Sequence, residues 1–144
     1  MLYIDTSSLL KTLWEEAESP AVRQVISLEA MVVVSSLTEL EVEVQLQAGW
    51  LGGRFSQARY RKYRSVFASL RGLAPFEFRE LPGTVFRQAI DRLTADGRLH
   101  CRTLNRLHLA AMAELGLHRL MTHDVKQAAT ARAQGCEVLS PGMA

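Results

Sequence analysis

Three times along this chain a short strand pattern ends at a polar residue, and a helical pattern follows. Two of the strands are the apolar runs 2–4 and 31–34, which are followed by Asp5 and Ser35, and the third is 118–122, which is followed by His123 and Asp124. A short apolar run that leads directly into a helix is typical of a buried strand in a parallel sheet. The repetition predicts an α/β fold, a three-layer α/β/α sandwich around a mainly parallel sheet of four to five strands.

The remaining pattern predicts two further strands and a series of helices. The strands are expected over residues 76–81, as an edge strand, and 136–139. The first helix is expected to follow Asp5 and to be capped by Thr6, Ser7 or Ser8. Glycine, proline and capping residues place the other helices at 19–28, 36–51, 55–73, 84–93, 103–115 and 125–134, with a turn at 95–97.

Length and composition predict one domain over residues 1–144. Apolar residues make up 48% of the chain and charged residues 22%, which excludes a disordered protein. No apolar run approaches the roughly 18 residues that span a bilayer, and no basic leader precedes one, so we expect a soluble, cytoplasmic protein. Cys101 and Cys136 lack the spacing of a zinc site or a disulfide framework and are expected to be buried thiols.

Two acids follow strands at the edge of a parallel sheet where chemistry usually gathers. Asp5 follows the first strand and Asp124 follows the run 118–122. Ligands of open α/β sheets bind outside the carboxyl ends of the strands, which favours a functional role for both acids. The simpler interpretation is that Asp5 only caps the helix that it precedes.

Two helices are expected to direct further polar groups inward. In the helix 36–51, Leu37, Leu40, Val44 and Ala48 form the expected inward stripe, and Glu41 falls within it. A carboxylate there is costly unless it is paired or bound to a cation, and a nearby Arg or Lys is the structural alternative. In the helix 103–115, Asn105 and His108 share a face, although a capping role and a core histidine are the simpler interpretations.

If Asp5, Glu41, Asn105 and Asp124 converge, several oxygen ligands lie together and three of them are anionic. Two unit charges about 4 Å apart repel by roughly 4 kcal/mol at an effective dielectric near 20, so the cluster would favour a bound cation. Ligation by oxygen alone indicates Mg²⁺ or Mn²⁺ rather than zinc. Such ions polarise a phosphodiester and activate a water molecule.

The helix 55–73 is basic and aromatic, with Tyr60 and Tyr63 on one arc. Arg54, Arg61, Arg64 and Arg71 lie beside it, and no acid occurs between Arg54 and Arg71. These arginines are weak candidates for contact with RNA. The alternative is that the aromatic residues are core and the basic residues a solvated face.

Four segments together resemble a PIN domain of the VapC toxin type. They are Tyr3 to Ser8, Ser35 to Val42, Arg102 to Ala111 and Leu120 to Asp124, and the resemblance runs through essentially the whole chain. It implies a metal-dependent endoribonuclease of a type II toxin–antitoxin system, which cleaves RNA, often transfer or ribosomal RNA, with a metal-activated water. It also implies a homodimer and an antitoxin that wraps the toxin.

By this resemblance, Asp5, Glu41 and Asp124 match acids that bind Mg²⁺ or Mn²⁺, and Asn105 stands where the family usually has Asp. Thr122 matches the hydroxyl residue beside the last acid, and Thr6 is a second supporting hydroxyl. Asn105 can still coordinate the ion, but it brings no charge, whether it is natural or introduced to silence a toxic nuclease. A catalytically weakened PIN fold that binds RNA or an antitoxin is therefore the alternative.

A phosphatase or phosphotransferase is a weaker alternative. A haloacid-dehalogenase pattern would need a second Asp two residues after Asp5, where this chain has Ser7. The sequence also has no glycine-rich phosphate-binding motif.

Overall fold

A computed structural model describes residues 1–94 and 99–144 and has an all-parallel five-stranded sheet at its centre. The strand order is β3-β2-β1-β4-β5. The strands are β1 (Leu2–Ile4), β2 (Val32–Ser35), β3 (Phe76–Arg79), β4 (Arg119–Met121) and β5 (Glu137–Leu139). The predicted α/β sandwich with a parallel sheet is confirmed, and β3 is an edge strand as expected. The predicted turn at residues 95–97 lies outside the described residues.

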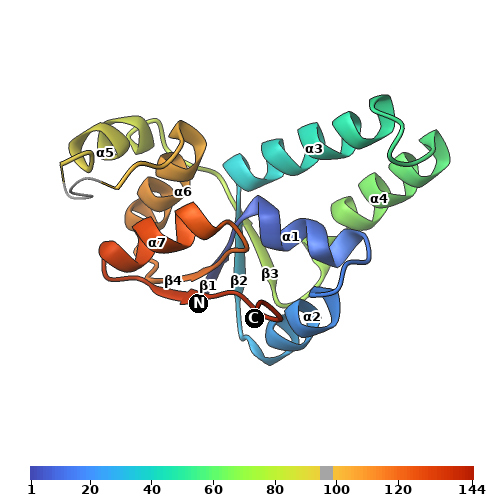
Figure 1. Cartoon of the computed structure of the whole chain (residues 1–144), viewed down its shortest axis with the longest axis horizontal. Helices are drawn as coiled ribbons and strands as arrows, with labels where there is room; N and C mark the ends of the chain where they lie inside the picture. The colour runs from blue at the N-terminus through green and yellow to red at the C-terminus, as the bar shows by residue number, and fades with distance from the viewer. Residues whose placement is uncertain (95–98) are drawn as a thin grey trace.

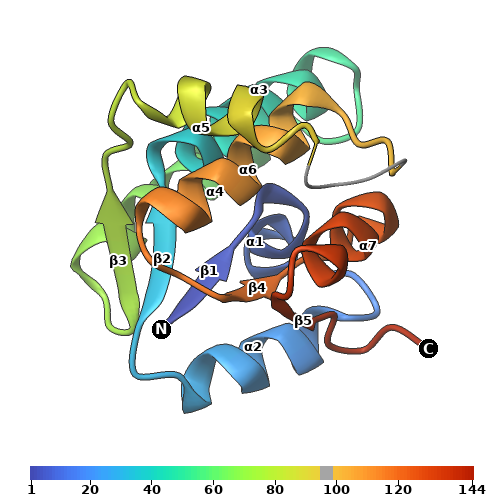
Figure 2. The same ribbon diagram turned by 90° about the vertical axis from the view of Figure 1, so that its left-hand side faces the viewer.

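Helices cover both faces of the sheet (Figures 1 and 2). The first group is α1 (Thr6–Leu13), α2 (Ser19–Leu28), α3 (Ser36–Leu51) and α4 (Gln57–Ser69), followed by a 3₁₀ turn at Leu70–Gly72. The second group is α5 (Val85–Asp91), α6 (Thr103–Glu114) and α7 (Val125–Ala133). Each group packs on its own hydrophobic core, so the layers are those expected from the sequence.

Alternation along the strands explains why both faces are covered. On β1, Leu2 and Ile4 point into the core beneath α1 to α4, whereas Tyr3 points into the core beneath α5 to α7. All three side chains are fully buried. A strand that is buried on both faces needs a continuous apolar run, which is the pattern of β1 and β2.

The inward face of α3 differs from the prediction. The buried residues of this helix are Thr38, Val42 and Leu46, whereas Leu40 and Val44 are 62% and 52% exposed. The helix carries apolar residues on several sides, so periodicity alone selected the wrong stripe. The predicted stripe around Glu41 is therefore not the buried face of the helix. Glu41 lies next to the face that is buried.

The first helix also begins differently from the prediction. Its N-cap is Asp5, whose side chain accepts a hydrogen bond from the Ser8 backbone N–H, and Thr6, Ser7 and Ser8 belong to the helix. Cys101 is buried and Cys136 half-buried, and both are free thiols. Among the described residues, no helix is long and apolar enough to cross a membrane.

Candidate active site

Asp5 and Asp124 lie at the carboxyl edge of the sheet, after two neighbouring strands. β1 and β4 pair in parallel with Ile4 opposite Met121, so the residues that follow both strands emerge side by side. Each acid caps the helix that it precedes: Asp5 accepts from Ser8 N–H at 3.0 Å and Asp124 from Gln127 N–H at 2.9 Å. The capping interpretation of Asp5 is therefore correct, but it accounts for only one of its contacts.

Asp5 is 2% exposed and is held by three hydrogen bonds. Besides Ser8 N–H, Oδ1 accepts from the Ser7 hydroxyl at 2.7 Å, and Oδ2 accepts from the Thr122 hydroxyl at 2.5 Å. Burial raises the pKa of the Asp5 carboxyl above its ordinary value, against the opposing effects of the His108 charge and these hydrogen bonds. A buried carboxyl of this kind gains from a cation that replaces its lost hydration.

Thr122 connects the two acids. Its hydroxyl donates to Asp5 Oδ2 and accepts the Asp124 backbone N–H at 3.0 Å. Ser7 makes a parallel link, because its hydroxyl donates to Asp5 and accepts the His123 backbone N–H at 2.9 Å. These two hydroxyls fix the ends of β1 and β4 relative to each other.

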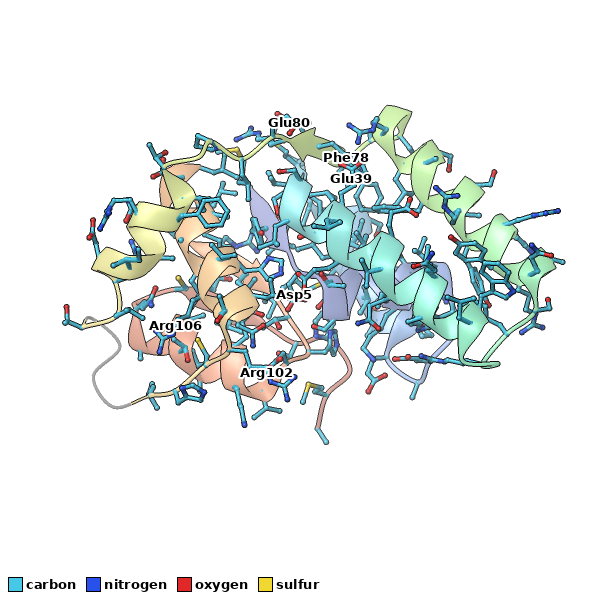
Figure 3. The ribbon with its side chains drawn as sticks, turned by 90° about the horizontal axis from the view of Figure 1, so that it is seen from above. Asp5, Glu39, Phe78, Glu80, Arg102 and Arg106 are labelled. Atoms are coloured by element: carbon cyan, nitrogen blue, oxygen red, sulfur yellow. The ribbon has the colours of Figure 1, made fainter. Side chains whose placement is uncertain are left out.

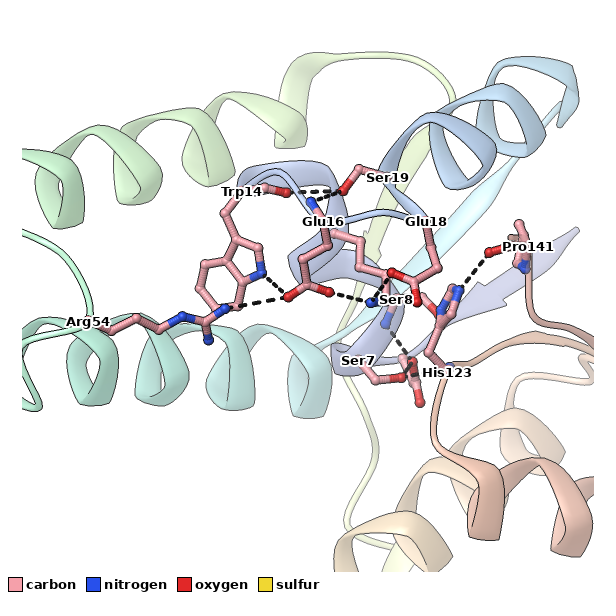
Figure 4. Close-up of polar contacts among 11 residues, drawn as sticks. Ser7, Ser8, Trp14, Glu16, Glu18, Ser19, Arg54, His123 and Pro141 are labelled. Atoms are coloured by element: carbon pink, nitrogen blue, oxygen red, sulfur yellow. Dashed lines mark hydrogen bonds and ion pairs between the residues drawn. The ribbon is translucent and has the colours of Figure 1, made fainter. Parts of the chain in front are cut away.

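His123 extends this connection to the end of the chain. It joins the Ser8 hydroxyl, at 2.8 Å from Nδ1, to the Pro141 carbonyl, at 2.9 Å from Nε2 (Figure 4). Because a carbonyl only accepts, Nε2 carries the proton. The segment after β5 is thereby held against α1.

Glu41 reaches the site from α3 and is bonded on Oε1. Thr6 donates its hydroxyl to this oxygen at 2.9 Å, and His108 Nε2 makes a short contact with the same atom. Burial raises the pKa of Glu41, but the hydrogen bond and charge of His108 and the Thr6 hydroxyl outweigh it, so the pKa lies below its ordinary value. The partner of Glu41 is thus a histidine, where the structural alternative from the sequence was an Arg or Lys.

Tyr3 orients His108 from behind. The Tyr3 hydroxyl lies 2.7 Å from His108 Nδ1 and 2.7 Å from the Ser35 hydroxyl, and all three side chains are buried. The Tyr3 hydroxyl donates to Nδ1 of a neutral His108 and accepts from Nδ1 of a charged one, so the contact is compatible with both protonation states. This chain of bonds runs from the strand ends to the carboxylate of Glu41.

Asn105 contacts the acid that follows β4. Its side-chain Nδ2 donates to Asp124 Oδ2 at 3.2 Å, from the first turn of α6. An Asp at this position would repel Asp124, whereas the amide satisfies one of its oxygens. Asn105 is therefore a partner of Asp124 in this arrangement.

A cavity of about 570 Å³ lies at this edge of the sheet. The cavity contains every predicted catalytic and metal-binding residue, Asp5, Glu41, Asn105 and Asp124, together with the supporting Thr6. Thr122 contacts the cavity acids from behind. Further residues line the cavity that the sequence pattern did not assign to the site: the polar residues Gln45, Arg102, Thr103 and Gln127 and the apolar residues Leu10 and Leu104.

Arg102 and Gln127 add distinct chemistry to the cavity. Arg102 is exposed at the start of α6, and Figure 3 shows its position relative to Asp5, which lies near the centre of that view. Gln127 is 1% exposed, and its Nε2 has no hydrogen-bond partner in the described part of the chain. The sequence could have indicated Gln127, because it lies three residues after Asp124. An N-cap acid accepts a hydrogen bond from the backbone N–H at that position.

The oxygen atoms that line the cavity are of the kind that binds a hard divalent cation. Carboxylate and amide oxygens line the cavity, and these are the ligands that such cations prefer. Among the described residues, however, no three His, Cys, Asp or Glu side chains form a group that could hold an ion together. Glu41 is instead bonded to His108 and Thr6, and Asp124 to Asn105. The metal site remains a prediction.

The four arginines predicted to contact RNA lie between the end of α3 and the 3₁₀ turn after α4, and none of them lines this cavity. Three are paired with acids: Arg54 with Glu16 at 3.5 Å, Arg64 with Glu43 at 2.8 Å and Arg71 with Glu39 at 2.5 Å. Arg61 is exposed on α4. The ion pairs weaken the case for Arg64 and Arg71 as RNA contacts, because their charges are already compensated.

A family model described as PIN domain matches residues 2–140 of this chain. Solved structures with the same fold include VapC20 from Mycobacterium tuberculosis, a sarcin-ricin loop cleaving toxin, at 15% identity and a TM-score of 0.72, covering 98% of this chain and 100% of that one. VapBC2 from Rickettsia felis, bound to a DNA fragment from its promoter, is similar at 12% identity and a TM-score of 0.71, covering 96% and 98%.

A third similar structure is FitAcB from Neisseria gonorrhoeae, at 14% identity and a TM-score of 0.71, covering 98% of both chains. No curated protein matches the sequence. At these identities the solved structures establish a shared fold, while the family model extends over nearly the whole chain.

Proposed function

Because the chain belongs to the PIN domain family, we propose that it is a metal-dependent endoribonuclease, the toxin of a toxin–antitoxin pair that acts in the cytoplasm. The observation that carries this proposal is the cavity that Asp5, Glu41, Asn105 and Asp124 line at the carboxyl edge of the sheet. Four oxygen-bearing side chains from four separate segments meet there. Capping alone gives no reason for Glu41 and Asn105 to join the two strand-end acids.

The ion proposed for this cavity is Mg²⁺ or Mn²⁺, held by Asp5, Asp124, Asn105 and Glu41. When bound, such an ion polarises a phosphodiester and makes a water molecule more acidic. The protein's own residues orient the ligands: Ser7 and Thr122 hold Asp5, and Thr6 holds Glu41. Arg102, exposed at the cavity, supplies a positive charge for a phosphate of the RNA.

Cleavage of RNA by the pure protein tests the proposal. We expect cleavage of transfer or ribosomal RNA in Mg²⁺ or Mn²⁺, its loss on addition of a chelator, and its loss in Asp5→Asn. The Asp5→Asn variant keeps the shape of the side chain, so a matching circular dichroism spectrum would exclude misfolding. Cleavage that persists in the chelator or in the variant would reject the mechanism.

One observation favours a second candidate function, a weakened nuclease that mainly binds RNA or an antitoxin. Asn105 brings no charge and spends one oxygen of Asp124 on a hydrogen bond. Fewer free anionic oxygens mean weaker attraction for a dication. RNA binding without cleavage in Mn²⁺, by protein shown to be folded, would support this candidate.

The proposal includes two protein partners. The similar VapBC2 structure contains DNA from its promoter, and the resemblance implies an antitoxin that covers the site. The second partner is another copy of this chain. Leu40 and Val44 on α3 and Phe86 and Ile90 on α5 are between 52% and 62% exposed, and Leu40 and Phe86 line one apolar groove of about 220 Å³. Exposed apolar groups that share a groove are typical of an interface.

A further inference from the structure

A second cleft, of about 420 Å³, lies at the far end of α1 from the active site. Three aromatic rings line it, those of Trp14, Phe55 and Tyr63, together with three cations, Arg54, Arg59 and Lys62. The cleft is distinct from the active-site cavity, because no residue lines both. Neither the resemblance nor the proposed mechanism assigns it a role.

Two packed helices connect this cleft with the active site. On α1, Leu10 lines the active-site cavity, and Trp14, the C-cap residue of this helix, lines the second cleft. On α3, Gln45 lines the cavity, and Gly49 follows one turn later. A Cβ on Gly49 would lie 2.4 Å from the Phe55 ring, so the absence of a side chain there lets Phe55 enter the cleft wall. α1 has eight residues and spans about 12 Å, so the two sites lie close enough for one RNA strand to reach both.

The aromatic residues form a single cluster whose rings are half-buried. Trp14 and Tyr63 meet edge to face with centroids 6.1 Å apart, and Phe55 and Tyr63 likewise at 5.1 Å. The guanidinium of Arg54 lies over the Trp14 ring, 4.4 Å from its centroid. Aromatic faces and arginine planes are the groups on which unpaired bases stack.

The charge of the cleft is positive because its acids already have partners. Glu15, which also lines the cleft, is paired with Arg23 at 2.8 Å. Glu16, which Arg54 approaches at 3.5 Å, also accepts from Lys11 and from the Trp14 indole (Figure 4). Arg59 and Lys62 are exposed on consecutive turns of α4. Their charges are therefore available to an anion that enters the cleft.

We propose that this cleft, walled by Trp14, Phe55 and Tyr63 and made cationic by Arg59 and Lys62, binds a single-stranded part of the RNA whose backbone is cleaved at the other end of α1. The inference rests on the proposed function. It assigns RNA contact to the residues of this cleft in place of Arg64 and Arg71. Charge complementarity favours RNA as the occupant, because phosphates match the cations and bases match the rings. A segment of a protein partner is the competing occupant.

Binding of RNA without metal tests the cleft separately from catalysis. The probe is a fluorescent single-stranded oligoribonucleotide of about 12 nucleotides, and its anisotropy is measured in a chelator at several salt concentrations. Arg59→Gln and Lys62→Gln are each expected to weaken binding by about threefold to tenfold and to reduce the slope of log affinity against log salt by about 0.7, the value for one phosphate contact on a single strand. Both side chains are exposed, so the fold is expected to remain intact.

Arg87→Gln is the matched control, since Arg87 is exposed on α5, at the opposite end of the molecule from α4 (Figure 1). It removes the same charge and is expected to change affinity by less than twofold. Equal effects of Arg87→Gln and the cleft variants would overturn the inference, because only bulk charge would then matter. Cleft variants that bind RNA normally but bind a cognate antitoxin weakly would also overturn it and assign the cleft to the protein partner.

The results distinguish a failure of the cleft inference from a failure of the proposed function. If the wild-type protein cleaves RNA in Mg²⁺ and the cleft variants bind RNA normally, the cleft inference fails alone. If the wild-type protein neither binds nor cleaves RNA, both fail.

Discussion

The side-chain amide of Asn105 donates a hydrogen bond to Asp124 Oδ2 at 3.2 Å, where the resemblance implies that a second carboxylate would stand. The amide is a neutral donor to an acid that is expected to bind a cation. Asn105 thus reduces the negative charge of the site and occupies one of its oxygens. The resemblance therefore implies that this site carries one negative charge fewer than the pattern that it resembles.

Replacing Asn105 by Asp is expected to strengthen metal binding and RNA cleavage. The new carboxylate adds a charge beside Asp124, and we expect Mn²⁺ affinity to rise by at least about tenfold, or about 1.4 kcal/mol. Titration calorimetry with Mn²⁺ and cleavage assays measure both effects. Asn105→Ala is the control, because it removes the hydrogen bond without adding charge. If Asn105→Ala tightens Mn²⁺ binding as much as Asn105→Asp, charge is not the cause.

The buried bonds of Tyr3 predict a cost for removing one hydroxyl. Tyr3→Phe leaves His108 Nδ1 and the Ser35 hydroxyl without their shared partner. We expect the free energy of unfolding to fall by about 1–3 kcal/mol, measured by denaturant unfolding. Tyr63→Phe changes a half-buried tyrosine and is expected to stay within about 0.5 kcal/mol. Equal losses in the two variants would show that the Tyr3 network does not stabilise the protein.

The sequence located the strand ends and their acids because both signals are local. The apolar run 2–4 stops at Asp5, and a short strand pattern precedes Asp124, so both signals are visible without knowledge of the rest of the fold. Both acids lie at the sheet edge as predicted. The pattern does not show which face of α3 is buried, because the helix has apolar residues on two faces. Leu40 and Val44 lie on one face, and Val42 and Leu46 lie on the other. The exposed pair was mistaken for the core stripe, which is the error expected when a helix also presents an apolar surface to solvent.

The ion-pair and hydrogen-bond partners of charged residues could also not be predicted from the sequence. Nothing in the pattern indicates that Glu39 and Glu43 of α3 pair with Arg71 in the 3₁₀ turn and Arg64 on α4, because these contacts depend on how two helices meet. The bond from His108 to Glu41 joins residues 67 positions apart in the sequence. His108 shares a helix face with Asn105, and that signal marked it as inward-facing without identifying its partner.

An ion-pair cluster beside the second cleft, in which a buried lysine meets two half-buried acids, predicts a pH dependence of stability. Lys11 is 9% exposed and bonded to Glu16 and Glu18. The hydrogen bond from Lys11 lowers the pKa of Glu16, so this contribution is present above the ordinary value near 4.5 and is lost as the pH falls through the lowered pKa. Burial alone would lower the pKa of Lys11, but its bonds to the two acids raise it, so its contribution is lost only as the pH rises through that raised value.

Lys11→Met is therefore expected to lower the unfolding temperature most between about pH 5 and pH 10, where both charges are present in the wild-type protein. At about pH 3 the difference from the wild type should shrink. Lys62→Met, at an exposed position, is the control and should show little difference at any pH. A constant difference for Lys11→Met across the whole range would mean that lost packing, not charge, is responsible.

The apolar groove between α3 and α5 predicts the oligomeric state. Phe86→Glu places a charge in the groove that Leu40 and Phe86 line, and we expect it to convert a dimer into a monomer in light scattering coupled to gel filtration. Leu28→Glu is the control, since Leu28 is 79% exposed on α2. A wild-type monomer, or a Phe86→Glu variant that remains dimeric, would contradict the proposed interface.

The most direct test of the account is a calorimetric titration of the metal-free protein with Mn²⁺, compared with Asp5→Asn and Asp124→Asn. The account predicts that the wild-type protein binds the ion and that each variant, with an unchanged circular dichroism spectrum, binds it at least about tenfold more weakly. Equal binding by all three proteins, or no binding by the wild type, would contradict the claim that the acids at the sheet edge form a metal site.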